Sequence, residues 1–368
     1  MPLSKIVAKS ITDDTITTDQ IADTSVHGRR NIIQNGAMQI AQRGTSSTSS
    51  GYQTVDRFKI DAAGFSVTQS QQSLTSGSPY DEGFRYFVRA ANTSVSSGTT
   101  DYLHMYQYIE AQNLTQSGWN YTSSASKVTF SFWARSSLAG TYYINLRTQD
   151  GTVQAYSSAF TLVADTWKKV SFVLPGNSNI TINNDNGRGL FIGVLPHYGT
   201  HYTTSGYTVD QWAAYSNTNI TPDFAQNWGN TANATFDLTG LQLEVGEVSN
   251  PVFEHISYGE ELALCQRYFQ LPGNSAYYAG NGVGSATIST GIPLATPMRA
   301  LPSVPDTGYK FHRSGNVNSG TNSVTTVVYP TPGASSLQVR VSFGSGITDE
   351  AAYVLYATTE DFQLDAEL

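Results

Sequence analysis

The stretch KVTFSFWARSSLAGTYYINLRT, residues 127–148, contains the pattern that decides how this chain folds. In KVTFSFWAR (127–135) and again in TYYINLRT (141–148), apolar and polar residues alternate, and a short Ser- and Gly-containing segment separates the two runs. Successive side chains of a β-strand point to opposite faces, so this period of two is typical of a strand with one buried face. The stretch therefore predicts two strands.

Similar runs continue on both sides of this stretch, and no convincing helix interrupts them before residue 250. They are VDRFKI (55–60), FRYFVRA (84–90), YLHMYQYIE (102–110), WKKVSFVL (167–174), GLFIGVL (189–195) and TFDLTGLQLEV (235–245). Their connections are too short for crossover helices, which favours antiparallel pairing. Residues 29–250 are therefore predicted to form an antiparallel jelly-roll β-sandwich. Trp133 and Trp167 lie in alternating runs, so we expect both in the core.

Residues 251–270 carry the clearest helix signal and are predicted to link two β-rich parts. Ser257 and Glu260 have the spacing of a capping box, and Leu262, Cys265 and Phe269 then fall on one helical face, with Glu260 and Glu261 on another. Cys265 is expected to be a small buried hydrophobe. Residues 271–368 return to short strands punctuated by Gly, Ser, Asn and Pro, and predict a smaller C-terminal β-sandwich. The whole chain is thus predicted to be all-β.

The composition excludes several classes of protein. Charged residues make up only 13% of the 368 residues, and the net charge is −8. Nucleic-acid binding requires clustered Lys and Arg, which are absent, so no nucleic-acid partner is expected. The apolar runs are too short to cross a bilayer and no secretion signal is evident, so membrane insertion is not expected either. A single cysteine excludes an internal disulfide framework.

Residues 1–28 show an apolar residue at every fifth position. These are Ile6, Ile11, Ile16, Ile21 and Val26. A period of five fits neither a helix nor a strand, and one chain of this kind buries too little apolar surface to offset the entropy of ordering it. The segment is therefore predicted to wrap around sister chains or to dock on another protein, as an extended anchor. A disordered leader is the alternative.

Several landmarks resemble those of tail-fibre and related virion-fibre proteins of tailed bacteriophages. They are RNIIQNGAMQIAQRGTS (30–46), YQTVDRFKI (52–60), KVTFSFWAR (127–135), FDLTGLQLEVG (236–246) and PVFEHISYGEELALCQRYF (251–269). The last block is the most specific, although Val252 interrupts its PFEH pattern. The resemblance covers roughly residues 29–270; beyond it, IPLATPMRALPSVP (292–305) and the closing DAEL match more loosely. It implies a jelly-roll domain akin to carbohydrate-binding modules, a homotrimer and a place on the virion.

Catalytic and metal motifs are absent from the sequence. No G-x-S-x-G, H-E-x-x-H or phosphate-binding glycine loop occurs, and a polysaccharide depolymerase, the less favoured alternative, lacks its usual long repeats here. No enzymatic activity and no cofactor are expected. His197 and His201 could ligate a metal only on a helix, and their surroundings favour a loop. The resemblance also implies a structural Ca²⁺, with Asp237 and backbone carbonyls near Asn35 as its ligands.

The stretch PHYGTHYTTSGYTVDQWAAYSNTNITPDFAQNWGNTANA (196–234) is the most informative for binding. It is long, aromatic and poor in strand pattern. Aromatic rings beside amide groups are typical of sugar recognition, because rings stack on C–H faces while amides bind hydroxyls. The candidate glycan contacts are Tyr198, Tyr202, Trp212, Tyr215 and Trp228, with Tyr277 and Tyr278 as alternatives in the C-terminal part. The same aromatics could instead pack the loop onto the sandwich or onto a neighbouring subunit.

Two functions from different classes remain open at this point. The first is a trimeric tail fibre of the virion that attaches to a bacterial surface glycan. The second is a capsid fibre or decoration protein whose role is structural or weakly adhesive. In either case we expect a virion anchoring protein as a partner.

Overall fold

The computed structural model describes residues 29–272, 277–304, 309–313, 316–318, 323–328, 334–343, 345–357 and 363–368. The predicted anchor, with Ile6, Ile11, Ile16, Ile21 and Val26, lies outside these residues. Its role in trimerisation therefore stays a prediction.

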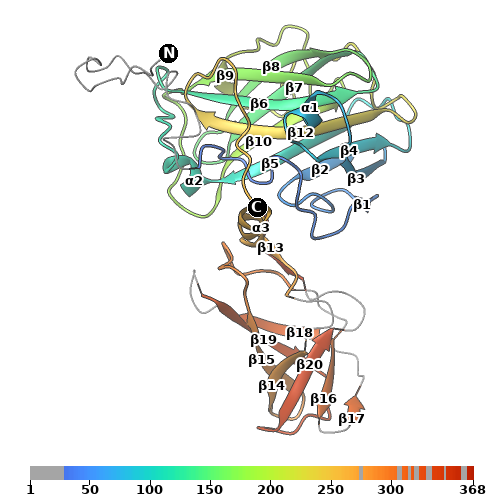
Figure 1. The fold of residues 1–368 in the computed structure, drawn as a ribbon, viewed down its shortest axis with the longest axis vertical. Helices are drawn as coiled ribbons and strands as arrows, with labels where there is room; N and C mark the ends of the chain where they lie inside the picture. Colours follow the sequence, from blue (N-terminus) through green and yellow to red (C-terminus); the bar gives the residue numbers. More distant parts are fainter. Residues whose placement is uncertain are drawn as a thin grey trace, which may run out of the picture.

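The first part of the chain is a sandwich of two six-stranded antiparallel sheets (Figure 1). The first sheet has the order β1 (Ser46–Ser47), β3 (Val67–Ser73), β4 (Tyr86–Asn92), β12 (Thr235–Val245), β6 (Lys127–Ser136) and β9 (Lys168–Pro175). The second has the order β11 (Trp212–Ala214), β8 (Gln154–Leu162), β7 (Gly140–Thr148), β10 (Arg188–Tyr198), β5 (Tyr102–Glu110) and β2 (Lys59–Ala63). The predicted antiparallel jelly-roll sandwich is confirmed. The strands β3 and β8 were not predicted from the sequence, because their Gln and Ser residues obscure the alternation of apolar and polar positions.

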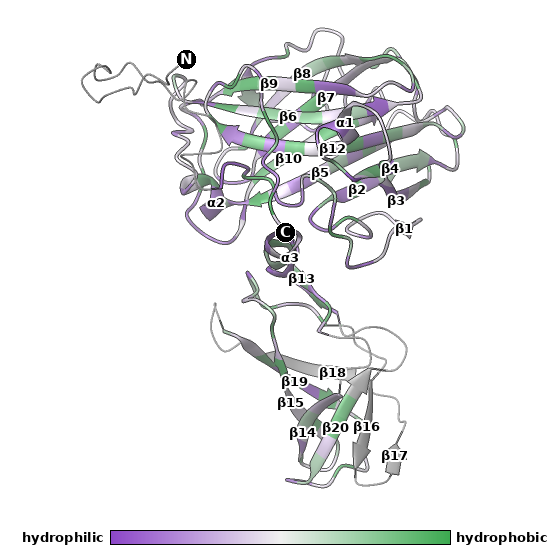
Figure 2. Cartoon of the chain, in the orientation of Figure 1, coloured by the Kyte–Doolittle hydropathy of each residue, from purple (hydrophilic) through white to green (hydrophobic). Residues whose placement is uncertain are grey.

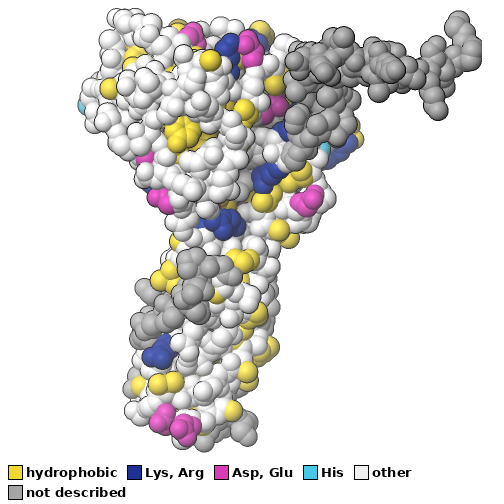
Figure 3. All heavy atoms as spheres, turned by 90° about the vertical axis from the view of Figure 1, so that its left-hand side faces the viewer, with side chains coloured by type: hydrophobic (Ala, Val, Ile, Leu, Met, Phe, Trp, Pro, Cys, Tyr) yellow, Lys and Arg dark blue, Asp and Glu magenta, His cyan; other side chains and the backbone are white. Residues whose placement is uncertain are grey.

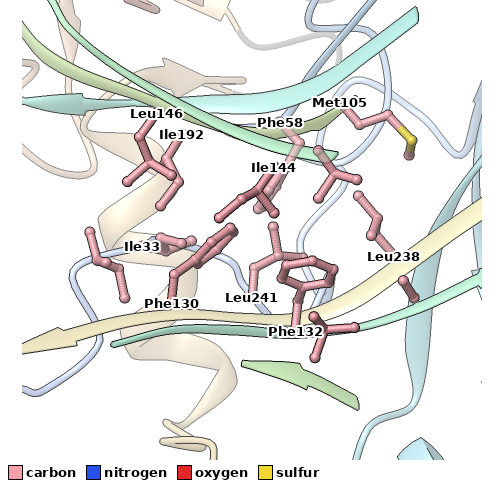
Figure 4. Close-up of a cluster of buried hydrophobic side chains, with 14 of the residues drawn as sticks. Ile33, Phe58, Met105, Phe130, Phe132, Ile144, Leu146, Ile192, Leu238 and Leu241 are labelled. Atoms are coloured by element: carbon pink, nitrogen blue, oxygen red, sulfur yellow. The ribbon is translucent and has the colours of Figure 1, made fainter. Parts of the chain in front are cut away.

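The two strands of the stretch 127–148 lie in opposite layers of the sandwich, because β6 belongs to the first sheet and β7 to the second. Figure 4 shows Phe130 and Phe132 pointing from β6 toward Ile144 and Leu146, among other buried aliphatic side chains. Figure 2 shows the corresponding banding of hydrophobic and hydrophilic residues along the strands. This interior is the main hydrophobic core, and burial of its side chains is the principal stabilising term.

Trp133 and Trp167 lie on the other face of the first sheet, in a smaller cluster with Phe87. Trp133 is buried and its indole N–H donates to Glu82 at 3.1 Å, whereas Trp167 is only half-buried and packs edge-on against Phe87. Both rings are therefore structural, but they belong to a satellite cluster rather than to the main core.

The predicted helix is present as α3 (Tyr258–Gln266), and the Ser257–Glu260 capping box is formed in both directions. Two shorter helices, α1 (Ser78–Asp81) and α2 (Ala111–Thr115), lie in the sandwich. The predicted faces of α3 are partly wrong. Glu261 is buried and accepts a hydrogen bond from the Asn35 backbone N–H at 2.6 Å, whereas Leu262 is only half-buried. The helix lies between the two β-rich parts (Figure 1). It contacts its surroundings through a polar side chain, Glu261, as well as through apolar ones.

The C-terminal part forms one seven-stranded antiparallel sheet rather than the two sheets of a sandwich. Its order is β17 (Asn316–Asn318), β16 (Tyr309–Arg313), β20 (Ala352–Ala357), β14 (Tyr277–Val283), β15 (Thr287–Pro293), β19 (Ser336–Ser342) and β18 (Ser323–Val328). A separate pair, β13 (Phe269–Gln270) and β21 (Leu364–Asp365), joins the end of α3 to the last residues of the chain. Within the described residues, the all-β class predicted from sequence is thus confirmed.

The last residues return to the sandwich beside α3. The Tyr52 hydroxyl donates to the Leu368 carbonyl at 3.0 Å, and the Arg43 guanidinium lies 3.0 Å from the Asp365 carboxylate. Arg299 adds a bridge, because it donates to the carbonyls of Asn186 at 2.7 Å and Ala366 at 2.6 Å. These contacts connect the two β-rich parts through polar groups.

The surface seen in Figure 3 carries few charged side chains, and most of its described area is neither charged nor hydrophobic. This agrees with the low charged fraction of the sequence. Within the described residues, no helix has the length and apolarity that a membrane span requires.

Candidate functional site

The aromatic loop between β10 and β12 lies over the outer face of the second sheet and is tied to it by backbone hydrogen bonds. Asp210 N–H donates to the Ser157 carbonyl at 2.8 Å, and Tyr215 N–H donates to the Val153 carbonyl at 2.9 Å. The Ser157 hydroxyl in turn donates to the Ile220 carbonyl at 2.9 Å. The two backbone bonds flank the pairing of β11 with β8, so this part of the loop extends the edge of the second sheet, whereas the Ser157 hydroxyl holds Ile220 over its outer face.

Most of the predicted glycan contacts hold this layer in place. Trp212 is half-buried, its indole N–H donates to the Pro175 carbonyl at 2.7 Å, and its ring packs edge-on against Tyr156. Tyr215 is also half-buried and accepts a hydrogen bond from Arg147 at 3.1 Å. These contacts favour the interpretation in which the aromatics pack the loop onto the sandwich.

Trp228, Tyr198 and Tyr278 have no ring face available for a sugar. Trp228 has a relative exposure of 0% and packs beside Phe65, Tyr198 is buried against neighbouring rings, and Tyr278 is buried with its hydroxyl on the Pro272 carbonyl. Stacking needs a solvent-accessible face, so these three predictions are corrected. Tyr202 is half-buried against Tyr198. Tyr277 alone is widely exposed, at 65%, on β14.

The outer face of the second sheet itself carries a row of aromatic residues that the sequence did not single out. His104 and Tyr106 of β5 lie near Phe191 of β10, and the Arg147 guanidinium lies 3.9 Å from the centre of the Phe191 ring. Burial, together with the charges of Arg147 and Lys59, lowers the pKa of His104 well below its usual value. The row is thus a mainly aromatic floor for the loop, with the cationic groups of Arg147 and Lys59 lying over two of its rings.

A cavity of about 300 Å³ opens where the aromatic loop meets the segment between β4 and β5. The side chains that matter for binding come from the end of β10 and from both halves of the loop: His197, Thr203, Asp223, Phe224, Gln226 and Asn227. Backbone from residues 97–99 closes the opposite wall. The sequence pointed to this loop but not to the cavity, because the residues of the two cavity walls are about a hundred positions apart in the sequence.

Close backbone packing shapes the wall formed by residues 97–101. Gly199 N–H donates to the Asp101 carbonyl at 2.7 Å, and His201 N–H donates to the Thr99 carbonyl at 2.9 Å. A Cβ atom on Gly199 would lie 2.3 Å from the Thr99 carbonyl oxygen, so only glycine fits here. The Asp101 carboxylate accepts the Gly98 N–H at 2.6 Å and fixes the turn from behind.

Phe224 and Asp223 form the other wall. Phe224 is half-buried and is held edge-on by Tyr143, with ring centres 4.9 Å apart, and more loosely by His197 and Tyr198. Asp223 is exposed and one of its carboxylate oxygens accepts the Thr203 hydroxyl. The cavity thus combines a fixed aromatic side chain with a carboxylate, an amide and a hydroxyl. Such a mixture of an apolar ring and a few hydrogen-bonding groups is typical of sites that bind small polar molecules.

His197 is the buried titratable group of this cavity. Its Nδ1 atom is buried without a hydrogen-bond partner within the described part of the chain. Burial lowers the pKa of His197 to about 4, although the charge of Asp101 opposes this. The ring is therefore neutral at physiological pH, and its Nδ1 atom is buried away from solvent.

Neither the His197–His201 pair, which the sequence already disfavoured as a metal site, nor the predicted Asp237 site is assembled as a cation site. His201 is exposed, and no cluster of three or more His, Cys, Asp or Glu side chains suited to a metal occurs among the described residues. Asp237 is buried, and its two oxygens accept hydrogen bonds from Arg89, at 2.7 and 2.9 Å, and Arg135, at 2.9 Å. Two guanidinium groups on one carboxylate disfavour Ca²⁺ there by charge repulsion, and the calcium itself stays an untested prediction.

Two further hollows are less suited to a ligand. One, of about 440 Å³, runs between the neighbouring edges of β8 and β9 and is lined by successive strand residues. The other, of about 260 Å³, is lined by Arg29, Arg30 and Arg267. Its charges are compensated, because Arg267 holds Glu110 at 2.8 and 2.9 Å and Arg30 lies 3.3 Å from Glu244.

Comparison with known proteins gives only remote structural likeness. No protein family matches the chain, and no curated protein does. Similar solved structures include a carbohydrate-binding module described as CBM4 (9% identity, 58% of this chain and 99% of that one, TM-score 0.30). A putative sugar-binding protein from Bacteroides thetaiotaomicron is 10% identical over 58% of this chain and 99% of that one, with a TM-score of 0.32. A cyclase from Fischerella sp. TAU is 9% identical over 61% of this chain and 100% of that one, with a TM-score of 0.35.

At these identities and TM-scores the likeness carries no argument about function, and the fold assignment rests on the sheet topology itself. The virion-fibre resemblance of the sequence has no counterpart in these comparisons.

Proposed function

We propose that this protein is a fibre protein of a tailed-bacteriophage virion that attaches to a bacterial surface glycan through its jelly-roll domain. The observation that carries the binding part is the cavity beside Phe224, with Asp223, Asn227 and Thr203 around it. The virion part is supported by the sequence landmarks between residues 29 and 270. In this proposal the protein is a homotrimer, held to its anchoring protein by residues 1–28, and binds without catalysis.

The cavity suits one sugar unit in size and chemistry. Its volume of about 300 Å³ lies at the lower end of the range for ligand pockets, which is roughly 300–1,000 Å³. The Phe224 ring can pack against the C–H face of a pyranose, while Asp223 and Asn227 can bind hydroxyls as acceptors and donors. Such a contact is weak alone. Three linked sites on a trimer can raise the overall affinity by ~10²–10⁴-fold.

The binding part is tested with the purified full-length protein and cells of a susceptible bacterium. Phe224→Ala and Asn227→Ala should each reduce adsorption at least severalfold without a matching fall in melting temperature. Tyr258→Ala is the matched control, because Tyr258 is an exposed aromatic residue at the start of α3, in another region. Unchanged adsorption of both cavity variants would overturn the assignment of the site. Tyr277 would then be the next aromatic residue to test.

The virion part is tested by labelling intact particles and by the double substitution Ile11→Asp and Ile16→Asp in the full chain. We expect the label on the tail, a trimeric mass for the parent protein, and loss of both trimer and incorporation for the variant. A label on the capsid would favour the capsid-fibre function instead. A monomeric parent protein that is absent from particles would contradict the proposal.

A further inference from the structure

The charges around the cavity are of one sign. Asp223 stands exposed at its wall, and the Asp101 carboxylate lies behind Gly98. None of the described residues that line the cavity is Lys or Arg. The guanidinium of Arg147 is directed elsewhere, since it lies over Phe191 and donates to the Tyr215 hydroxyl. A ligand in the cavity therefore meets negative charge without a compensating cation.

Asp223 is held in place for a ligand. The Thr203 hydroxyl donates to one carboxylate oxygen, and no hydrogen bond from the described residues reaches the other. Thr203 is buried and is bridged to Thr221, so the donor itself is fixed. A carboxylate oriented in this way can accept a charge-assisted hydrogen bond from a ligand without first losing conformational freedom.

The remaining polar groups of the cavity are uncharged. His197 is buried, its Nδ1 atom has no partner among the described residues, and Asn227 is an exposed amide at the rim. The Asn227 amide can bind the hydroxyls of any sugar, so it supplies affinity without discriminating between charge states. Discrimination by charge is left to Asp223.

We infer that the cavity selects sugars by charge, binding an amino sugar more tightly than the corresponding neutral sugar and rejecting the corresponding uronic acid. This inference rests on the proposed glycan binding. An ammonium group beside Asp223 gains a charge-assisted hydrogen bond, whereas a carboxylate meets a like charge and finds no cationic partner. Since Asp223 is exposed, solvent screens the effect, and we expect about three- to tenfold between neighbouring members of the series.

The test is a ligand-observed NMR titration of the full-length protein at pH 7 with matched methyl glycosides. Three sets are used: glucosamine, glucose and glucuronic acid, and the corresponding members of the galacto and manno series. In the set that binds, affinity should fall from amino sugar to neutral sugar to uronic acid. The difference should shrink as salt is raised from low to 0.5 M, because exposed charges are screened.

The variant Asp223→Asn should remove the order, so that the amino sugar, the neutral sugar and the uronic acid bind with similar affinity. Asp210→Asn is the matched control: Asp210 is an exposed aspartate of the same loop that binds Ser158 and does not line the cavity, so the order should persist. If neutral sugars bind, and amino sugars and uronic acids bind as tightly as they do, the inference is overturned. The proposed function then still stands. If no sugar of any set binds, the proposed function falls and the inference falls with it.

Discussion

Arg57 and Glu367, 310 positions apart in the sequence, form a buried ion pair between the sandwich and the last residues of the chain. Arg57 is fully buried, its guanidinium lies 3.4 Å from the centre of the Tyr268 ring, and it also donates to Gln34 and to the Tyr108 carbonyl. Burial by itself lowers the pKa of Arg57, but Glu367, Tyr268, Tyr52 and Cys265 together more than offset this effect, so the pKa is raised. The Arg57 guanidinium therefore stays charged at every physiological pH.

Removing one partner of this pair should destabilise the protein strongly. Glu367→Gln leaves the Arg57 charge buried without its counter-ion, and we expect a loss of about 3–5 kcal/mol in the free energy of unfolding, measured by urea denaturation. Lys127→Gln is the control, because it breaks the exposed Lys127–Glu247 pair and should cost less than about 1 kcal/mol. Equal losses in the two variants would show that the Arg57–Glu367 pair is solvated.

Asp56 should make stability fall as pH rises through the acid range. Burial raises the pKa of Asp56 from 3.8 to about 6, against the opposing effects of its hydrogen bonds from Gln42 and the charge of Arg43, and Glu367 raises it further. Between about pH 4 and 6 the folded state therefore binds more protons than the unfolded state. Stability decreases across that window, and Asp56 contributes no further pH dependence above it.

The measurement is thermal unfolding of the parent protein and of Asp56→Asn at pH values from 4 to 8, from which the free energy of unfolding of each protein is obtained. The difference in free energy of unfolding between the two should change by about 1–3 kcal/mol across the window and stay constant above it. Other carboxylates, such as Glu261, titrate in both proteins and cancel in the comparison. A constant difference over the whole range would contradict the raised pKa.

Glu261 should matter more for stability than Leu262, the reverse of what helical periodicity predicts. Glu261→Ala removes the acceptor of the buried Asn35 N–H and should cost about 1–3 kcal/mol. Leu262 is half-buried, so Leu262→Ala should cost less. Thermal and urea unfolding of the two alanine variants would decide, and a larger loss for Leu262→Ala would restore the original assignment of the helix faces.

Trp228 should behave as a core residue and Trp212 as a surface support. Trp228→Ala creates a cavity beside Phe65 and should cost about 3–5 kcal/mol, so any loss of adsorption in this variant reports misfolding. Trp212→Ala should cost less and leave adsorption unchanged, since Trp212 does not line the cavity. Adsorption lost in Trp212→Ala at an unchanged melting temperature would return the sugar site to that ring.

The features that depend on neighbouring residues could be predicted from the amino-acid sequence alone. The runs at 102–110 and 235–245 coincide with β5 and β12, because a period of two is visible wherever one strand face is buried against the core. The cap of α3 was predictable for the same reason, since Ser257 and Glu260 satisfy each other within one turn. Aromatic content also pointed to the loop at 196–234, although not to the right side chains.

Only the tertiary structure decided which groups meet across the chain. Glu261 faces inward because the backbone N–H of Asn35 donates to it, and Trp228 is buried because the end of the loop packs beside Phe65 and its carbonyl accepts a hydrogen bond from Asn92. The cavity lies between residues 97–101, which pack against Gly199, and the wall that carries Asp223, and no local pattern specifies such an approach. Periodicity records only whether a face is buried, whereas the partner that covers it is set by the order of strands in the sheets and by the free energy of the whole packed chain.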